Sequence, residues 1–308
     1  MIDKKIKIFI KAAISLLVLF FILHSIDFYR LVVVLKNVNL YYLFFSVVII
    51  YIGIIVSSIK WKILLRKQNI EVSLGKSCSA YYSGMFFNTF LPTVIGGDFV
   101  RAKIVSNDGA PFEKTLASIF FDRCLGFFAL SCLSFAGAVA GTKFDYPPKI
   151  IILAILIFVV VLGFFFLFFL TRNSLRLRDY LTRGKFRSTL LKYYEAMTVY
   201  KDFSKDIFFA LVLSFVFQFL SILYTFFIIS ALGVQLSIWF VFLLYSITTL
   251  FIMLPISISG IGLREASFVF FFISIGLSST LAVAAAFLSF SILVIINSLG
   301  GIVFILKK

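Results

Sequence analysis

The most constraining feature of the sequence is a long apolar run without a single charged residue. No Asp, Glu, Lys or Arg lies between Lys149 and Arg172, and the intervening residues are mostly aliphatic or phenylalanine. A helix of this length crosses a hydrocarbon core ~30 Å thick. The whole chain shares this character, because only 14% of its 308 residues are charged, whereas a soluble domain carries roughly 25%. The sequence therefore predicts an integral membrane protein.

Six segments are apolar and long enough to form full transmembrane helices. They cover residues 8–26, 40–59, 116–140, 150–171, 206–231 and 280–305. Two further apolar stretches, 77–95 and 238–256, are interrupted by Pro, Gly and polar residues, and a third at 266–277 is too short to span comfortably. No small-x-small cleavage pattern follows the basic N-terminus, so we expect an uncleaved first span there.

The basic residues predict the orientation of the chain. The formal net charge is +16, and most Lys and Arg lie at the N-terminus, after the second span, in the segment 171–205 and at the C-terminus. We assign five of them to the loop after the second span: Lys60, Lys62, Arg66, Lys67 and Lys76. We expect the protein in the plasma membrane. The positive-inside rule then predicts that both termini lie in the cytoplasm. Basic charge gathered in short loops indicates contact with anionic lipids and not with nucleic acid.

Neither a metal nor a cofactor is expected. The three cysteines, Cys78, Cys124 and Cys132, have no metal-ligand spacing, and a single histidine, His24, cannot build a metal site alone. No GxxxxGK[ST] run is present, so nucleotide hydrolysis by a P-loop is excluded.

Two parts of the sequence repeat one another. The same six residue types recur at the same offsets in the two copies: Tyr82, Ser83, Leu91, Pro92, Gly97 and Arg101 in the first, and Tyr245, Ser246, Leu254, Pro255, Gly260 and Arg264 in the second. The first copy follows two predicted crossings and the second follows five, so the copies are expected to be inverted. Inverted repeats with broken helices are typical of transporters, whose sites lie at the repeat interface.

These patterns together define the expected architecture. We predict an all-α polytopic membrane protein with about six full transmembrane helices and two inverted-repeat re-entrant helical hairpins that meet near the bilayer centre. Residues 1–308 form a single transmembrane domain. Its first repeat covers about 77–140, its second repeat covers about 238–305, and a basic cytoplasmic segment at about 171–205 links them.

Three motifs in order carry a resemblance to a known family. They are the run from Gly84 to Arg101, the patch from Asp122 to Gly126, and the run from Leu254 to Glu265. Together they resemble the lysylphosphatidylglycerol synthase transmembrane-domain family, also described as flippase-like integral membrane proteins. The resemblance implies movement of an aminoacylated phospholipid between leaflets. We expect no soluble synthase domain after the last span. The resemblance therefore implies lipid translocation and argues against lipid aminoacylation.

Charged residues beside or within the apolar segments are the candidate site. Each costs roughly 2.5–3.5 kcal/mol to insert and is a functional hypothesis by default. The candidate substrate-binding residues are Asn88, Asp98, Arg101, Asp122, Arg123, Arg264 and Glu265. We expect Asp98 to pair with Arg101, and Arg264 to pair with Glu265 or with a carboxylate of the other repeat. The planar guanidinium suits a phosphate group. The alternative is that these charges cap hairpin ends and stabilise the fold through ion pairs.

The leading functional hypothesis is translocation of a lipid between membrane leaflets, without enzymatic activity. The expected partner is an anionic or aminoacyl phospholipid or a polyprenyl-phosphate-linked lipid. Two alternatives remain open: a membrane-embedded lipid-head transferase that uses Asp98, Asp122 or Glu265, and an accessory subunit of an envelope-glycan pathway.

Overall fold

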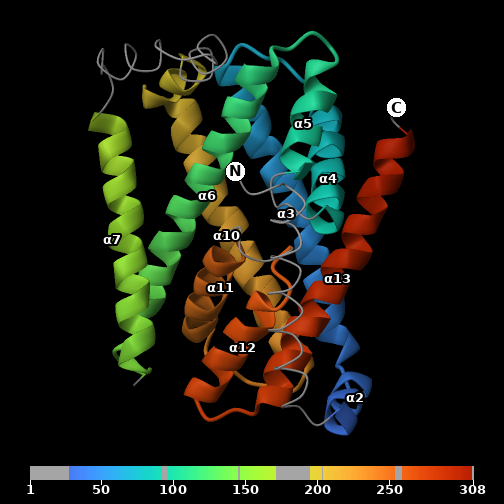
Figure 1. The fold of residues 1–308 in the computed structure, drawn as a ribbon, viewed down its shortest axis with the longest axis vertical. Coiled ribbons are helices and arrows are strands. Elements are labelled where there is room, and N and C mark those ends of the chain that lie inside the picture. The colour runs from blue at the N-terminus through green and yellow to red at the C-terminus, as the bar shows by residue number, and fades with distance from the viewer. Residues whose placement is uncertain are drawn as a thin grey trace, which may run out of the picture.

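The computed structural model describes residues 28–91, 96–144, 146–170, 195–202, 204–253 and 259–306. Within these ranges the chain is helical and contains no strand (Figure 1). The helices are α2 (Phe28–Lys36), α3 (Leu40–Lys67), α4 (Leu74–Phe90), α5 (Gly96–Ser106), α6 (Phe112–Gly141), α7 (Pro148–Leu170), the 3-10 turn η1 (Val199–Lys201), α10 (Lys205–Ala231), α11 (Ile238–Met253), α12 (Leu263–Ser274) and α13 (Ser279–Leu306).

Five described helices are long and apolar enough to cross a membrane. They are α3, α6, α7, α10 and α13. These helices coincide with five of the six predicted spans, and the remaining prediction, 8–26, lies outside the described residues. The all-α polytopic membrane fold is therefore confirmed.

Helix α3 is longer than the sequence suggested. The predicted span ended at residue 59, whereas the helix continues to Lys67. The apolar face continues as well, because Trp61, Leu64 and Leu65 are fully buried. The assignment of five basic residues to a loop was therefore wrong, because Lys60, Lys62, Arg66 and Lys67 lie in α3 and Lys76 lies in α4. The Lys60 side chain is moreover buried, at only 3% exposed.

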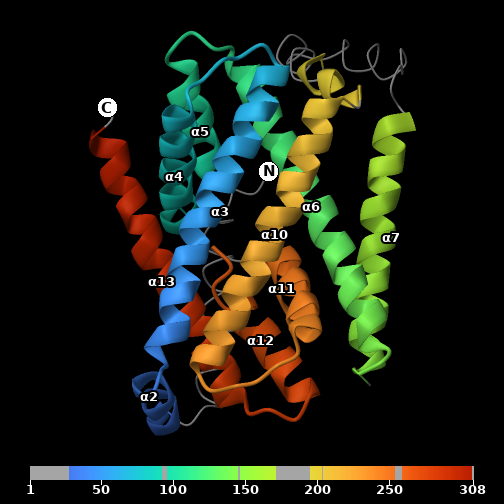
Figure 2. The same cartoon turned by 180° about the vertical axis from the view of Figure 1, so that it is seen from behind.

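Two pairs of short helices lie at opposite ends of the molecule. Figure 1 shows α4 and α5 in the upper half and α11 and α12 in the lower half, and Figure 2 shows the same arrangement from behind. Helix α4 has 17 residues and α11 has 16, which correspond to about 25 Å of helix each. Each is shorter than a bilayer core of ~30 Å.

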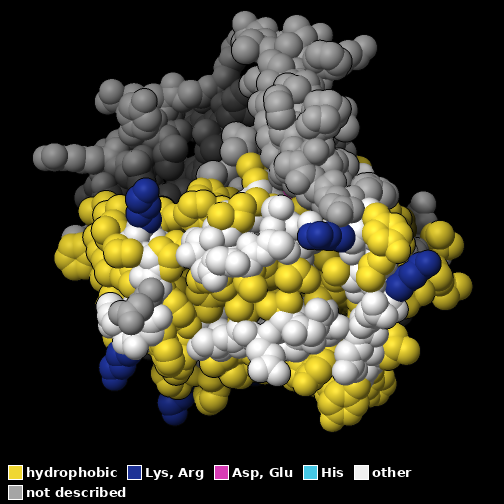
Figure 3. All heavy atoms as spheres, turned by 90° about the horizontal axis from the view of Figure 1, so that it is seen from below, with side chains coloured by type: hydrophobic (Ala, Val, Ile, Leu, Met, Phe, Trp, Pro, Cys, Tyr) yellow, Lys and Arg dark blue, Asp and Glu magenta, His cyan; other side chains and the backbone are white. Residues whose placement is uncertain are grey.

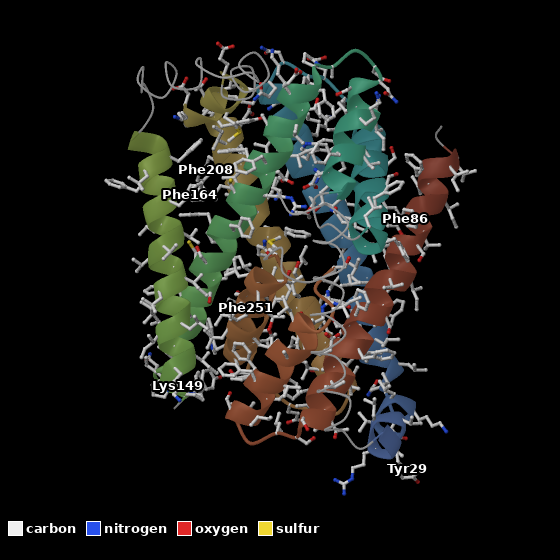
Figure 4. All side chains as sticks on the ribbon, in the orientation of Figure 1. Tyr29, Phe86, Lys149, Phe164, Phe208 and Phe251 are labelled. Carbon is white, nitrogen blue, oxygen red and sulfur yellow. The ribbon has the colours of Figure 1, made fainter. Side chains whose placement is uncertain are left out.

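Close contact with α13 positions α4. A Cβ atom on Gly300 would lie 2.4 Å from the Tyr82 carbonyl oxygen, so only glycine allows the two helices to approach this closely. The Tyr82 hydroxyl donates to the Ile296 carbonyl oxygen at 2.6 Å, and the Asn297 amide donates to Thr89 Oγ1 at 2.8 Å. Figure 4 shows Phe86 at the same interface, where a Cβ on Gly301 would meet its ring at 2.8 Å.

The surface is apolar over most of its described part. Helix α7 stands at the edge of the bundle with many exposed large side chains, including Val160 and Phe166 (Figure 1). The lower end, seen in Figure 3, displays hydrophobic and uncharged side chains with scattered Lys and Arg and no visible acidic group. This surface fits lipid contact better than contact with bulk water.

Candidate functional site

The N-terminus of α5 is packed tightly against α4. The Gly97 backbone N–H donates to Asn88 Oδ1 at 2.8 Å, so Asn88 satisfies one of the free N–H groups at this helix start. A Cβ on Gly97 would lie only 1.9 Å from the Gly84 carbonyl oxygen, and a Cβ on Gly84 would lie 2.5 Å from Arg101 Cγ. Glycine at both positions therefore lets α5 approach α4 and brings Asp98 and Arg101 into the protein interior.

Five charged side chains from three helices meet there, and we call them the charge cluster. They are Lys60 from α3, Asp98 and Arg101 from α5, and Asp122 and Arg123 from α6. Lys60 Nζ lies 2.9 Å from Asp122 Oδ1, and Arg123 Nε lies 2.6 Å from Asp98 Oδ2. Arg101 is held more loosely, at 3.8 Å from Asp98 Oδ1 and 3.6 Å from Asp122 Oδ2.

Two aromatic rings enclose Arg101. Its guanidinium carbon lies 4.2 Å from the ring centroid of Trp61 and 4.4 Å from that of Tyr81. The Trp61 indole N–H donates to Ser118 Oγ at 3.0 Å, which fixes the ring between α3 and α6. Arg101 thus gains cation–π attraction from two rings at a buried position.

Most side chains of the charge cluster are deeply buried. Lys60, Asp98, Arg101 and Asp122 are each at most 5% exposed, so each depends on its partners for compensation. Within the described ranges, three cations face two carboxylates in the ion pairs of the cluster. Among the described residues, Nε and Nη2 of Arg101 have no hydrogen-bond partner. Two carboxylate oxygens, Asp98 Oδ1 and Asp122 Oδ1, also have no hydrogen-bond partner among these residues, so the cluster is held by ion pairs more than by hydrogen bonds.

The second repeat arranges its charged residues differently. Glu265 Oε2 accepts a hydrogen bond from the Gly262 N–H at 2.7 Å and so caps the start of α12. The Arg264 guanidinium stacks on Phe290, with its central carbon 4.5 Å from the ring centroid. In the described part of the chain no carboxylate lies within 4.0 Å of Arg264. The predicted ion pair of Arg264, with Glu265 or with a carboxylate of the other repeat, is therefore wrong.

Arg264 faces a cavity of about 250 Å³. Its wall is mostly apolar and comes from α3, α4, α10, α11, α12 and α13. Its polar lining consists of the following side chains: Ser221, Tyr224, Thr225, Tyr245, Thr248, Thr249, Arg264 and Ser289. Phe217 lines this cavity too, and its ring centroid lies 5.7 Å from Lys60 Nζ, so this one ring contacts both the cavity and the charge cluster.

The breaks in the two repeats contact each other. The Ser259 hydroxyl lies 3.3 Å from the Thr89 carbonyl oxygen and 3.2 Å from the Leu91 carbonyl oxygen. Leu91 follows the last residue of α4, and Ser259 precedes α12. The repeat prolines, Pro92 and Pro255, lie outside the described residues.

The structure brings four of the seven candidate residues into one cluster: Asp98, Arg101, Asp122 and Arg123. Asn88 lies beside them as a helix cap, and Arg264 and Glu265 lie apart from them. Arg101 does not line the Arg264 cavity. Sequence reasoning missed Lys60, Trp61 and Tyr81. The continued helical spacing of Trp61, Leu64 and Leu65 was the available signal for the first two.

Comparison with known proteins agrees with this architecture. The family model described as the lysylphosphatidylglycerol synthase TM region matches residues 8–301. Two matching relatives, each described as a UPF0104 membrane protein, come from Methanothermobacter thermautotrophicus, with 23% identity over 82% of this chain and 80% of the relative, and from Pyrococcus horikoshii, with 21% identity over 91% and 90%. A further UPF0104 membrane protein from M. thermautotrophicus is 26% identical over 42% of this chain and 38% of its own length.

No solved structure matches the chain significantly. The match of the family model nevertheless extends from the predicted first span almost to the end of α13 and includes both short-helix pairs and the charge cluster. The chain belongs to the lysylphosphatidylglycerol synthase transmembrane-region family.

Proposed function

We propose that this protein moves a lipid between the two leaflets of the cell membrane and that it does so without chemical conversion. The observation that carries the proposal is the contact between two broken helical segments from opposite halves of the molecule, next to buried charged residues. The hydrogen-bonding distances from Ser259 to Thr89 and Leu91 define this contact. The candidate substrates are anionic or aminoacyl phospholipids and polyprenyl-phosphate-linked lipids.

The short helices support an arrangement of inverted, re-entrant hairpins. Helices α4 and α11 are each too short to cross a hydrocarbon core, and each is followed by a break and a second short helix. A chain that enters and returns leaves free backbone groups at membrane depth, which is tolerated where protein or a polar cavity covers them. In this proposal the hairpins enter from opposite sides, with both chain termini in the cytoplasm.

A lipid head needs polar groups along its route because hydrocarbon does not solvate charge. The charge cluster lies with α5 in one half, and the Arg264 cavity borders α11 and α12 in the other. Phe217 contacts both. We propose that a head group passes between these two regions while its acyl chains stay in the membrane.

The carboxylates favour transport over an embedded transferase. A transferase needs a carboxyl group that is available as acid, base or nucleophile. Asp122 forms an ion pair with Lys60, and Asp98 forms one with Arg123. The Glu265 carboxylate accepts a hydrogen bond from the Gly262 N–H. These engagements support a transport role for the surrounding residues.

Reconstitution in liposomes tests the proposal. Fluorescent anionic and aminoacyl lipids are added to proteoliposomes, and dithionite reports how much label reaches the protected leaflet. We expect exchange well above protein-free vesicles, and a large loss in Arg101→Gln, with Arg66→Gln as a control for charge removal at an exposed site. Background exchange for every lipid tested would refute the translocase, whereas conversion of the lipid by the purified protein would establish the transferase.

A further inference from the structure

The Arg264 cavity has the composition of an anion site enclosed by apolar walls. Of its lining residues, Arg264 is the one that carries a charge, and no acidic side chain lines it within the described part of the chain. The nearby Glu265 carboxylate is held by the Gly262 N–H at 2.7 Å. A ligand that enters this space therefore meets the Arg264 guanidinium, whereas the neighbouring Glu265 carboxylate lies outside the lining.

Two donors at this cavity lack partners. Among the described residues, Arg264 Nη1 and Thr248 Oγ1 are buried and have no hydrogen-bond partner. Thr248 is only 3% exposed, and both residues line the cavity. Other hydroxyl groups on the wall are engaged, because Tyr224 donates to the Ser289 carbonyl oxygen and Thr225 donates to the Ser221 carbonyl oxygen. Buried donors without partners are rare and indicate a missing acceptor.

The size of the cavity limits what it can accept. At about 250 Å³ it is smaller than typical small-molecule sites of roughly 300–1,000 Å³. A head group fits this space, whereas two acyl chains do not. The position of Arg264 in the first turn of α12 adds the positive end of the helix dipole, and the guanidinium geometry matches a phosphate.

We propose that the Arg264 cavity binds the phosphate group of an amphiphile that carries no cationic group on its head. Arg264 and Thr248 donate to the phosphate oxygens. A lysyl or other aminoacyl head is disfavoured because its ammonium group finds no carboxylate in the cavity. This inference rests on the proposed function, because it selects among the candidate lipids of the translocase. Binding to the cavity can nevertheless be measured without transport.

Binding in neutral maltoside micelles tests the site. The probes are dodecyl phosphate, inorganic phosphate and dodecyltrimethylammonium, titrated against the full chain by microscale thermophoresis with amphiphile expressed as mole fraction. We expect dodecyl phosphate to bind and dodecyltrimethylammonium not to bind. Inorganic phosphate that binds equally well would identify a free-anion site and overturn the amphiphile part of the proposal.

Variants assign the binding to the cavity. Arg264→Gln should weaken dodecyl phosphate binding by roughly tenfold to one-hundredfold, and Thr248→Val by about fivefold, as expected for loss of hydrogen bonds to a charged group. Gly53→Leu provides an independent route if Arg264→Gln fails to fold. Gly53 lines the cavity, and a Cβ there meets Phe217 at an ordinary 3.6 Å, so the added side chain fills the ligand space and should abolish binding. The control, Arg66→Gln, should bind like the wild type.

The outcomes separate this inference from the proposed function. Leaflet exchange by a protein whose dodecyl phosphate binding is insensitive to both Arg264→Gln and Gly53→Leu would overturn the site and leave the translocase standing. Dodecyl phosphate binding that depends on Arg264, without any leaflet exchange, would support the binding site and refute the proposed translocase function.

Discussion

Arg101 and Arg264 occupy equivalent positions in the sequence repeat but have opposite surroundings. Arg101 lies between two aromatic rings and faces two carboxylates within the charge cluster. Arg264 stacks on one ring, has no ion-pair partner in the described residues and borders a cavity. A repeat in sequence thus places two arginines in matching local elements, while their partners come from other helices. The arginine of the first repeat lies in a closed ionic contact, whereas the arginine of the second lines an open cavity.

This contrast predicts opposite effects on stability when charge is removed. Asp122→Asn should lower the free energy of unfolding by about 3–5 kcal/mol, because it leaves Lys60 buried without its carboxylate partner and leaves Arg101 with Asp98 alone. Arg264→Gln should be neutral or slightly stabilising, since it removes a buried charge that has no carboxylate within 4.0 Å among the described residues. Denaturation in maltoside micelles measures both.

A second substitution in the charge cluster checks the cause. Lys60→Met in the Asp122→Asn background should recover part of the lost stability, because it removes the cation that lost its carboxylate partner. An equal loss of stability in Arg264→Gln and Asp122→Asn would mean that the two arginines are held alike, and the comparison would fail.

The glycines of the two breaks sharpen the same comparison. Gly97→Ala should cost about 3 kcal/mol, because its Cβ would meet the backbone oxygen of Gly84 at 1.9 Å. Its equivalent, Gly260, has φ +79°, and its Cβ would meet the side chain of Ile252 at 2.5 Å. Gly260→Ala should therefore cost about 1–2 kcal/mol.

An added Cβ would meet a backbone atom at Gly97 and a side chain at Gly260, and second-site substitutions can distinguish the two. Ile252→Ala should restore part of the stability lost in Gly260→Ala, since a side chain can be shortened, whereas no side-chain change removes the Gly84 carbonyl. Gly163→Ala on α7 is the matched control. A Cβ there meets nothing within 4 Å, so this change should stabilise the helix by about 0.5–1 kcal/mol. A loss in Gly163→Ala similar to that in Gly97→Ala would show that the crowding argument is wrong.

Much of this fold is readable from the sequence because hydrocarbon imposes simple rules. Apolar length predicted five described spans, and the repeat predicted where the short helices break. The repeat also located both arginines. Ion-pair partners were harder to predict. We expected Asp98 to pair with Arg101, whereas the shorter of its two contacts is to Arg123 on α6, at 2.6 Å. Which of two ion-pair partners lies closer depends on how the helices pack, and the local sequence does not indicate it.

Lys60 shows a different kind of failure. Basic residues after an apolar run are usually interfacial, so Lys60 was grouped with the basic residues that follow it in the sequence. Its ammonium group is instead buried because Trp61 and Leu64 continue the core and Asp122 supplies a counter-charge. Composition alone therefore cannot distinguish a topology signal from a member of the site, although helical spacing can.

The helix start of the first repeat gives a smaller effect. Asn88→Ala should lower the unfolding free energy by about 1 kcal/mol, because the Gly97 N–H loses its acceptor at 2.8 Å. Asn88→Asp keeps an acceptor and tests whether Asn88 acts as a cap, although it adds negative charge near Asp98. If Asn88→Ala impairs leaflet exchange without any loss of stability, Asn88 contacts the substrate and is more than a cap.

The smallest effect is expected for an ion pair at the exposed end of α3. Arg66 contacts Asp206 at 2.5 Å, but its side chain is 63% exposed, and pairs in such surroundings contribute roughly 0–1 kcal/mol. Arg66→Gln should therefore change the unfolding free energy by about 0.5 kcal/mol or less and leave leaflet exchange intact. Lys60→Gln, less than two turns earlier on the same helix, should destabilise the protein several-fold more, because it leaves the buried Asp122 with only its longer contact to Arg101. Short distance alone would rank Arg66 above Lys60, whereas burial reverses the order. Equal effects of these two substitutions would show that the charge cluster is solvated, and the distinction between a closed contact and an open cavity would no longer hold.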